Sequence, residues 1–458
     1  MNFIEIKKKV LERTPHLKKT LEHKGDLKLL TYFEESVTFS NPVSLERQEE
    51  LLRTVKEMIE RLINPEIAET AITQLRKHYY ASTADHHGPI THPFFVNSHL
   101  AQSVAYQKHQ LKYMFVFSCG GISLNNSSLP RGILFHDAEL NKKQLNFISL
   151  KHRHHPVFSF PAYTKKDIDT NIPEKLGTIL GDVYTNKKVL NCTKYSDQIT
   201  YSNYLLWKKI PGQEHMNLIY LEQEEIVNEL LLKYHLDTPT FLTRLLTDES
   251  VLDIFEECFD GIQGAFSSET HTGTTLFWAI HKGKRKQLKR RKNILESLDG
   301  LYQVSLTPEG IKEAIKKQEL MPSMALSFIV LSFYYGLTCG GGFLQVNYLT
   351  YLKDAYKKLL ARIEKTDEIK LVNLIKTDYF CGEFVFAKIK GKRIAYASSI
   401  DLIIYKNEDT ARKLQELAKI GTLGEAVDHM MPKFYKILYG KEALVDMPEH
   451  TFPPCIYV

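Results

Sequence analysis

The amino-acid sequence predicts an α/β protein with a Rossmann-like, doubly wound parallel sheet, helical insertions and a small α+β part near its carboxyl end. Two observations lead to this prediction. An extended segment at 78–84 is followed by a loop, an apolar-periodic helix from Pro93 and a second apolar strand at 113–118, which is the βαβ unit of such sheets. The loop, 83–95, concentrates histidines beside an aspartate and a glycine. Because ligands in such folds lie at strand carboxyl ends, against a helix amino terminus, this loop is the predicted site.

The length and composition indicate several globular units. At about 150 residues per domain, 458 residues correspond to roughly three. We expect a helical N-terminal cover over 1–77, a core over 78–350 with a mostly helical insertion at about 160–270, and a small α+β domain over 351–458. Hydrophobic residues make up 43% of the chain and charged residues 25%, which is ordinary for a soluble globular protein.

Hydrophobic spacing predicts the helices, and short apolar or alternating runs predict the strands. Before the core, the periodic helices are 1–24 and Leu45–Ile63. After the βαβ unit, we expect strands at Arg131–Phe135 and Gln144–Leu150 and, inside the insertion, helices at Leu230–Leu246 and Val251–Phe259.

The later part of the chain begins with a predicted hairpin at 274–288, where β-type residues flank a Lys-Gly turn. The stretch Leu320–Leu352 has no charged residue. Its Ser, Gly, Gln and Asn residues nevertheless interrupt the apolar sequence, whereas a membrane span requires a run of roughly 20 predominantly apolar residues. We therefore expect a buried helix that ends in a Gly-rich turn. Strands at Phe384–Ile389 and Ile400–Tyr405 and helices after Asp409 and Gly424 complete the prediction.

The six cysteines form no CxxC pair, and the amino terminus MNFIEIKKKV has no apolar secretory segment. These features favour a cytoplasmic protein with reduced thiols and no membrane association. The partners we expect are small-molecule substrates, including an amino acid, and a homo-oligomer is compatible with the sequence.

The candidate catalytic residues are Asp85, His86, His87 and His92, which gather at the predicted mouth of the site. Imidazoles can stabilise negative charge that develops on phosphate oxygens, and Gly88 lets the backbone approach a ligand. Asp85 would orient an imidazole or bind a cation. Clustered titratable groups in a cleft are typical of functional sites, whereas a lone histidine is more often structural.

Further candidates for cofactor binding follow the other strands. They share a small or amide side chain, or a guanidinium that can bind a carboxylate or phosphate. Together with Thr83 and Gly88 they are Gly120, Gly121, Asn125, Asn126, Arg131, Gly341 and Gly342. The alternative is that these residues form ordinary turns. Cys119 has no evident base beside it, so we expect a buried small residue and not a nucleophile.

The loop 83–95 resembles the first-strand motif of the bacillithiol synthase family, the cysteine-adding enzymes of bacillithiol biosynthesis, which reads Thr-Gly-Gln-Gln-x-Gly-x-x-x-Gly-Pro. Thr83, Gly88 and Pro93 match it, whereas His86 and His92 replace a Gln and a Gly. Later stretches are similar in order and spacing, so that the resemblance covers about 83 to 350. They are Leu276, Phe277, Gly283, Lys284 and Arg285, and the run from Leu320-Met321-Pro322 to Gly340-Gly341-Gly342 and Tyr348.

This resemblance implies a nucleotidylyltransferase-type Rossmann core and a biosynthetic ligase or transferase that joins an amino acid or thiol to a second small metabolite through a C–N or C–S bond. Nucleotide dependence stays open, with ATP or ADP as the implied cofactor. The chain departs from the family in two ways. Its second strand is followed by residues 119–126, CGGISLNN, where the family has an acidic stretch, and no long coiled coil is visible near the carboxyl end.

A metal-dependent phosphoesterase is the first alternative. Asp85-His86-His87 matches the metal-binding triplet of DHH phosphoesterases, whose carboxylate and imidazole ligands suit Mn²⁺ or a similar ion. A second histidine cluster, His152, His154 and His155, is the only source of further ligands. That class also needs an upstream Asp-x-Asp element, and none precedes residue 85. Whether the protein uses a metal therefore stays open.

A polyanion- or RNA-binding module is the second alternative, and it rests on residues 281–292. This run contains eight Lys or Arg and no acid, so that removing those eight charges from the net +6 leaves −2 elsewhere. Such a run can contact phosphate groups, but charge runs are usually solvated faces, and aromatic residues are not interleaved here. Nucleic acid is therefore the less favoured partner.

Overall fold

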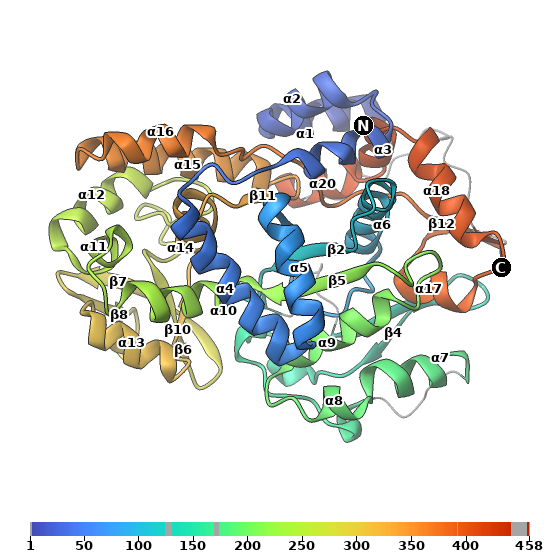
Figure 1. Cartoon of the computed structure of the whole chain (residues 1–458), viewed down its shortest axis with the longest axis horizontal. Coiled ribbons are helices and arrows are strands. Elements are labelled where there is room, and N and C mark those ends of the chain that lie inside the picture. Colours follow the sequence, from blue (N-terminus) through green and yellow to red (C-terminus); the bar gives the residue numbers. More distant parts are fainter. Residues whose placement is uncertain (1, 124–130, 169–173, 392, 441–455, 458) are drawn as a thin grey trace.

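The computed structural model describes residues 2–123, 131–168, 174–391, 393–440 and 456–457. Its centre is a parallel sheet of four strands (Figure 1). The strands lie in the order β11-β1-β2-β5, and all three neighbouring pairs are parallel. Their bounds are Thr338–Gly340 for β11, Tyr80–Ser82 for β1, Tyr113–Ser118 for β2 and Asn217–Glu222 for β5.

The βαβ unit predicted from the sequence is confirmed. Between β1 and β2 runs α6 (Pro93–Lys108), whose first position is a proline, where a missing N–H costs nothing. His92 caps the helix by accepting a hydrogen bond from the backbone of Phe94.

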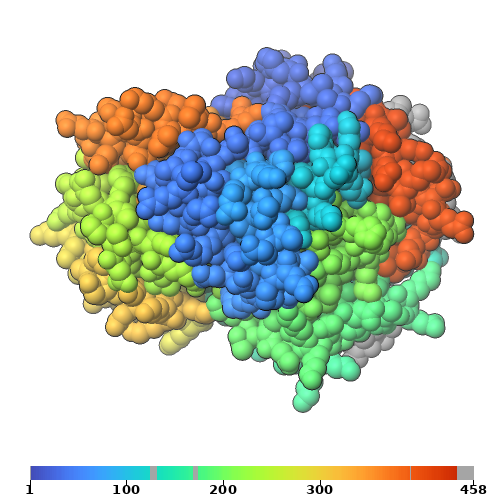
Figure 2. Space-filling view, viewed as in Figure 1, coloured from blue at the N-terminus to red at the C-terminus, as the bar shows by residue number. Residues whose placement is uncertain are grey.

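Helices cover both faces of the parallel sheet, and side chains alternate between two cores because strand residues point to opposite faces. In β2, Tyr113, Phe115 and Phe117 pack into one core, and Met114 and Val116 pack into the other. The first core holds α4 (Leu45–Leu62), α5 (Pro65–Lys77) and α10 (Gln223–Leu230), and the second holds α6. Figure 1 shows α4 and α5 in front of the sheet, and in Figure 2 the blue atoms of this part of the chain cover the middle of the same face.

Two strands of the parallel sheet, β5 and β11, were not predicted. β5 lies inside the stretch 160–270 that we interpreted as mostly helical, and it pairs with β2 over its whole length, from Tyr113–Asn217 to Ser118–Glu222. The rest of the stretch is indeed largely helical, although the expected helix Leu230–Leu246 is broken. Its helices are a 3-10 turn at Lys165–Asp167, α7 (Glu174–Ile179), a π-helical turn at Leu180–Tyr184, α8 (Lys187–Leu190), α9 (Tyr195–Trp207), α10, a second π-helical turn at Leu231–His235, α11 (Phe241–Thr247) and α12 (Glu249–Phe259).

A second sheet is antiparallel and contains the predicted hairpin. Its order is β10-β6-β7-β8-β9, and α13 (Pro308–Lys316) connects β9 to β10. The basic run lies on β6, β7 and the turns at their ends. The bounds are Phe277–His281 for β6, Lys284–Arg291 for β7, Ile294–Ser297 for β8, Gln303–Ser305 for β9 and Leu320–Pro322 for β10.

The uncharged stretch 320–352 is almost entirely buried, as expected, but it is not one helix. Two of its segments pair as strands, one in each sheet. The stretch consists of β10, α14 (Met324–Phe328), a π-helical turn at Ile329–Tyr334, β11 and the start of α15 (Gln345–Arg362). Within the described ranges, no helix combines the length and the apolar character that a bilayer crossing requires.

Two predictions for the carboxyl-terminal part were wrong. Ile400–Tyr405 is not a strand, because Ser398 and Asp401 form a capping box that starts α17 (Ser399–Ile404). Of the predicted strand Phe384–Ile389, only the end belongs to β12 (Lys388–Lys390), which pairs with β13 (Ile394–Tyr396) and β14 (Ile456–Tyr457). The helices predicted after Asp409 and Gly424 are confirmed. Besides α17, this part contains α16 (Thr366–Leu374), α18 (Thr410–Ile420), α19 (Leu423–Asp428) and α20 (Met431–Tyr439).

Three further features lie around the parallel sheet: a bridge beside β11, a separate hairpin and the amino-terminal helices. Gly341 forms a parallel bridge with Phe380, which extends the sheet beyond β11. The predicted strands after β2 form a separate hairpin of β3 (Gly132–His136) and β4 (Lys142–Asn146). At the amino terminus, α1 (Phe3–Arg13) packs on α20, and α2 (Pro15–Lys24) and α3 (Leu29–Glu34) follow it.

Candidate functional site

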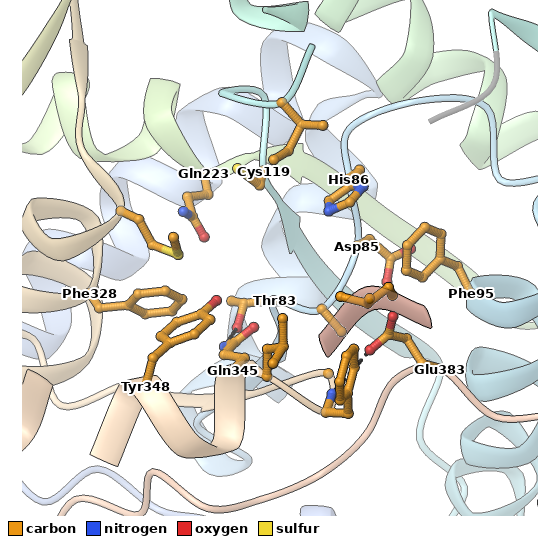
Figure 3. Close-up of a pocket in the computed structure, with 17 residues that line it drawn as sticks. Thr83, Asp85, His86, Phe95, Cys119, Gln223, Phe328, Gln345, Tyr348 and Glu383 are labelled. Carbon is orange, nitrogen blue, oxygen red and sulfur yellow. Dashed lines mark hydrogen bonds between the residues drawn. The ribbon is translucent and has the colours of Figure 1, made fainter. Parts of the chain in front are cut away.

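A cavity of about 370 Å³ opens at the carboxyl edge of the parallel sheet (Figure 3). After β1 the chain proceeds outward to β2 and β5, and it returns to the other side of β1 only with β11. The strand order therefore reverses between β1 and β11, and loops that leave such strands diverge and create a crevice. The lining residues come from six separate stretches of the chain: Thr83, Ala84, Asp85, His86, Phe95, Cys119, Ile122, Gln223, Met324, Phe328, Gly342, Phe343, Leu344, Gln345, Tyr348, Glu383 and Ile437.

Asp85 is held in a fixed position at the cavity wall. Both of its carboxylate oxygens lie 3.0 Å from Nε2 of His99, and the hydroxyl of Tyr220 lies 3.3 Å from Oδ2. Both side chains of the Asp85–His99 pair are 1% exposed. A buried carboxylate with two donors is oriented more tightly than a solvated one.

His86 offers a ring nitrogen that the protein does not use. Its Nδ1 is buried without a hydrogen-bond partner in the described structure, and its ring packs against Phe95 with centroids 5.7 Å apart. Burial lowers the pKa of His86 to about 4, partly opposed by Asp85. At neutral pH the ring is therefore uncharged. It can form a hydrogen bond with a bound molecule or accept a proton from it.

Gln223 provides a second unsatisfied polar atom. It is the first residue of α10, directly after β5, and only 2% of it is exposed. Its Oε1 has no hydrogen-bond partner in the described structure, although it lines the cavity. Because a buried amide oxygen without a partner costs about 1–3 kcal/mol, a ligand that donates to it would recover that energy.

Glu383 brings a second carboxylate to the cavity. Its backbone φ is +66°, a left-handed conformation that is uncommon for a residue with a long side chain. The backbone N–H of Phe343 donates to its Oε2 at 3.0 Å. Burial raises the pKa of Glu383, and Lys433 opposes this rise. A Cβ atom at Gly342 would lie 2.6 Å from the same Oε2, so the glycine makes room for this carboxylate.

The opposite side of the cavity is aromatic. Figure 3 shows Phe328 and Tyr348 across the cavity from Asp85 and Glu383. Between them, Gln345 donates from Nε2 to the Thr83 hydroxyl at 2.5 Å, and that hydroxyl donates to the carbonyl of Gly340 at 3.0 Å. The cavity thus joins two acidic groups and neutral hydrogen-bonding groups to an apolar wall, an arrangement that suits a small molecule with an amine at one end.

Of the four predicted catalytic residues, only Asp85 and His86 reach this cavity. His87 is fully buried, and its two ring nitrogens lie 2.7 Å from Ser118 Oγ and 3.0 Å from the carbonyl of Ser196. His92 lines a different cavity.

Among the predicted cofactor-binding residues, Thr83 and Gly342 line the cavity, and Gly88, Gly120, Gly121, Arg131 and Gly341 do not. Gly88 accepts a hydrogen bond from Asn203, and Arg131 donates to the carbonyl of Ile148. A Cβ atom at Gly341 would lie 2.7 Å from the Gln345 side chain. Asn125 and Asn126 lie outside the described residues.

The glycines after β2 contact a carboxylate of the protein itself. The backbone N–H groups of Gly120 and Gly121 donate to Glu224 at 2.7 and 2.9 Å, and the Cys119 thiol donates to it at 3.1 Å. Glu224, in the first turn of α10, therefore places a carboxylate at the end of β2. These two N–H groups are not available to a phosphate, and burial together with Glu224 raises the pKa of Cys119, so its thiol stays protonated.

The geometry also bears on the two alternative hypotheses. Both ring nitrogens of His87 are engaged by protein partners, and no group of three or more potential metal ligands occurs in the part of the chain that the structure describes. The lining contains none of His152, His154 and His155. In the basic run, Lys286, Arg290 and Arg291 form ion pairs with Asp299, Glu256 and Glu296, and Arg285 donates to the carbonyl of Gly121. Much of that charge is balanced locally.

The sequence did not identify His99, Gln223, Glu224 and Glu383 as site residues. Gln223 and Glu224 had a signal, because the apolar run NLIYL before them is typical of a buried strand and is followed by four polar residues. For Glu383, the sequence contains no signal that indicates a place in the site.

No protein-family model matches the chain, and no curated protein sequence matches it.

Proposed function

We propose that this protein is a biosynthetic ligase or transferase that joins an amino acid or an amino thiol to a second small metabolite through a C–N or C–S bond, and that the cavity between β1 and β11 is its active site. The observation that carries this proposal is the pair of unsatisfied buried atoms, His86 Nδ1 and Gln223 Oε1, at the point where the strand order reverses. Polar atoms buried without a protein partner require an explanation, and a ligand supplies it here.

The charge of the cavity supports an amine-bearing substrate. Asp85 and Glu383 are the only charged residues in its lining, among the described residues, and an ammonium group is complementary to both. Phe328 and Tyr348 would contact the apolar part of the same molecule. A phosphate group has no comparable set of donors here, since the N–H groups of Gly120 and Gly121 are engaged by Glu224. If the reaction uses ATP or ADP, the nucleotide binds outside this cavity.

The strand order supports a Rossmann-like core. Numbered along the chain, β5-β2-β1-β11 is the order 3-2-1-4, which begins the doubly wound Rossmann arrangement. The bridge from Gly341 to Phe380 adds a fifth position beside β11. This order agrees with the resemblance of residues 83–95 to the bacillithiol synthase motif. Of the residues that match the motif, Thr83 lines the cavity and Gly88 does not.

The chemistry that the residues support rests on positioning and proton transfer. Asp85 and Glu383 would hold the substrate ammonium. His86, uncharged at neutral pH, would accept the proton that the attacking thiol or amine loses as the C–S or C–N bond forms, and would return it to the group that leaves the second metabolite as its bond to that carbon breaks. Binding both reactants in one cavity raises their effective concentration. Cys119 has no role as a nucleophile, because its pKa is raised and its thiol is bound to Glu224.

An activity screen tests this proposal. The protein is incubated with amino acids, including cysteine, and a metabolite extract, with and without ATP, and adducts are sought by mass spectrometry. Wild type should form an adduct that contains the amino acid, and Asp85→Asn and His86→Ala should form little. His154→Ala, at a residue outside the cavity, is the matched control and should equal wild type. An adduct that all variants form equally would refute the assigned site.

A further inference from the structure

A second cavity, of about 540 Å³, lies beside the amino-terminal end of α6. It is bounded by the first turn of α6, the β3–β4 hairpin and the β12–β13 hairpin. Its lining residues are His92, Pro93, Phe94, Leu134, His136, Lys142, Lys388, Ile394, Ala395, Tyr396, Ser398 and His429. None of them lines the first cavity.

The charge of this cavity is opposite to that of the first. Two lysines and three histidines line it, and among the described residues no aspartate or glutamate does. Lys388 is only 6% exposed, although lysines are rarely so buried. Lys433 lies next to the cavity, with its ammonium 4.1 Å from the centre of the Phe94 ring.

The cations affect one another across this cavity. Burial lowers the pKa of His92, and Lys433 and Lys142 lower it further. Burial also lowers the pKa of Lys388, and burial lowers that of Lys433 to about 8, a shift that Glu383 opposes and Lys142 increases. Each lowered pKa means that the protonated, positively charged form of the group is disfavoured in these surroundings. A bound anion would stabilise that form.

His136 is oriented by a carboxylate behind it. Asp401, which is fully buried, accepts hydrogen bonds from His136 Nδ1 and from its backbone N–H, both at 2.7 Å. The backbone N–H of Ser398 also donates to Asp401 at 2.8 Å. The hydrogen bond from Nδ1 to Asp401 fixes the orientation of the His136 ring. The other ring nitrogen, Nε2, has no hydrogen-bond partner among the described residues. A carboxylate in this position fixes the tautomer and the orientation of the ring.

We propose that this second cavity binds a small oxyanion, the phosphate or carboxylate groups of a polyanionic metabolite. Lys142 and Lys388 would supply charge, and His92 and His136 would supply hydrogen bonds. The backbone N–H groups at the start of α6 are not the basis of the site, because those of Phe94 and Phe95 already donate to His92.

The two cavities are separated by a thin aromatic wall. The ring of Phe95 lies 5.7 Å from that of His86, in the first cavity, and 5.6 Å from that of His92, in the second. Oxyanion binding is inferred from the second cavity alone and does not depend on the proposed reaction. The two cavities are nevertheless close enough for a cationic reactant in the first and an anionic reactant in the second to lie side by side.

Binding of defined oxyanions tests this inference. Inorganic phosphate and citrate are titrated into the full chain by isothermal calorimetry at constant ionic strength. Lys388→Met, which keeps the side-chain length, and Lys142→Ala should each weaken binding about tenfold or more, because each removes a charge-assisted hydrogen bond. Lys143→Ala, at the neighbouring position on β4 where the lysine pairs with Asp137, is the matched control and should bind like wild type. Thermal melts verify that each variant is folded.

The outcomes distinguish the ligand source and the two sites. Tighter binding of phosphate assigns the site to phosphate esters, and tighter binding of citrate assigns it to polycarboxylates; either supports the inference. Asp85→Asn should bind the oxyanion like wild type even if it abolishes the reaction. Absence of binding by wild type, or equal binding by Lys388→Met, Lys142→Ala and wild type, would overturn the inference.

Discussion

Nε2 of His99 lies 3.0 Å from both carboxylate oxygens of Asp85, and neither side chain is more than 1% exposed. The two residues are fourteen positions apart and on different elements, since Asp85 follows β1 and His99 is inside α6. His99 therefore positions the carboxylate that we assign to substrate binding.

This relationship makes His99 testable as a positioning residue. His99→Leu leaves Asp85 without its main donor, so we expect substrate binding to weaken about tenfold or more and stability to fall by about 1–3 kcal/mol. His99→Gln, which retains an N–H donor, should recover part of the binding. Titration calorimetry and urea unfolding of the same samples separate the two effects. A loss of stability with unchanged binding would contradict the positioning role.

A prediction for Gly120 tests the contact with β5. An added Cβ atom would lie 1.8 Å from Glu222 Oε1, so Gly120→Ala should destabilise the protein by about 1–3 kcal/mol, a usual cost of overpacking. Gly177→Ala is the control, because a Cβ atom there would meet nothing within 4 Å. Urea unfolding measures both. Equal stability of the two variants would show that Glu222 does not occupy this position.

Cys119 should be dispensable for the chemistry. Because its pKa is raised by burial and by Glu224, the thiolate that reacts with alkylating agents is scarce at neutral pH. We expect Cys119→Ser to retain most of the activity and Cys119 to react slowly with iodoacetamide in the folded protein, as followed by peptide mass mapping. Rapid alkylation with loss of activity, or a trapped thioester at Cys119, would contradict the non-covalent mechanism.

The buried histidines predict the pH dependence of stability. Burial lowers the pKa of His87 from 6.5 to about 4, so the unfolded chain binds the extra proton between these values. The stabilisation that His87 provides is therefore complete above pH 6.5 and is lost as the pH falls towards 4. The difference in free energy of unfolding between wild type and His87→Gln should shrink over that window in urea titrations. A difference that is constant or grows on acidification would be inconsistent with a buried, neutral His87.

The sequence predicted the parts of this structure that depend on local spacing. The βαβ unit around α6, the basic hairpin and the helices α4, α12 and α18 all follow from periodicity within short windows. Asp85, His86 and Thr83 were placed at the site because the end of a strand and the start of a helix bracket them. Gly342, which we predicted as a cofactor-binding residue, lines the cavity, and the absence of a side chain at Gly342 leaves room for the Glu383 carboxylate.

The parts that were not predicted depend on contacts between distant residues. His87 and His86 are neighbours with the same side chain, and only the position of Ser118 and Ser196 decides that one is structural and the other faces the cavity. Glu383 reaches the site through a hydrogen bond to Phe343 and an unusual backbone conformation. Neither fact has a signature in the local sequence.

The most direct measurement of the central claim is the binding of a free amine in the cavity between β1 and β11. L-cysteine and N-acetyl-L-cysteine, which differ in the ammonium group, are titrated into wild type, Asp85→Asn and the control His154→Ala by calorimetry. We predict that L-cysteine binds to wild type and to His154→Ala, that N-acetyl-L-cysteine binds about tenfold or more weakly, and that Asp85→Asn loses the preference between them. Equal binding of the two compounds by wild type, or an unchanged preference in Asp85→Asn, would contradict the account.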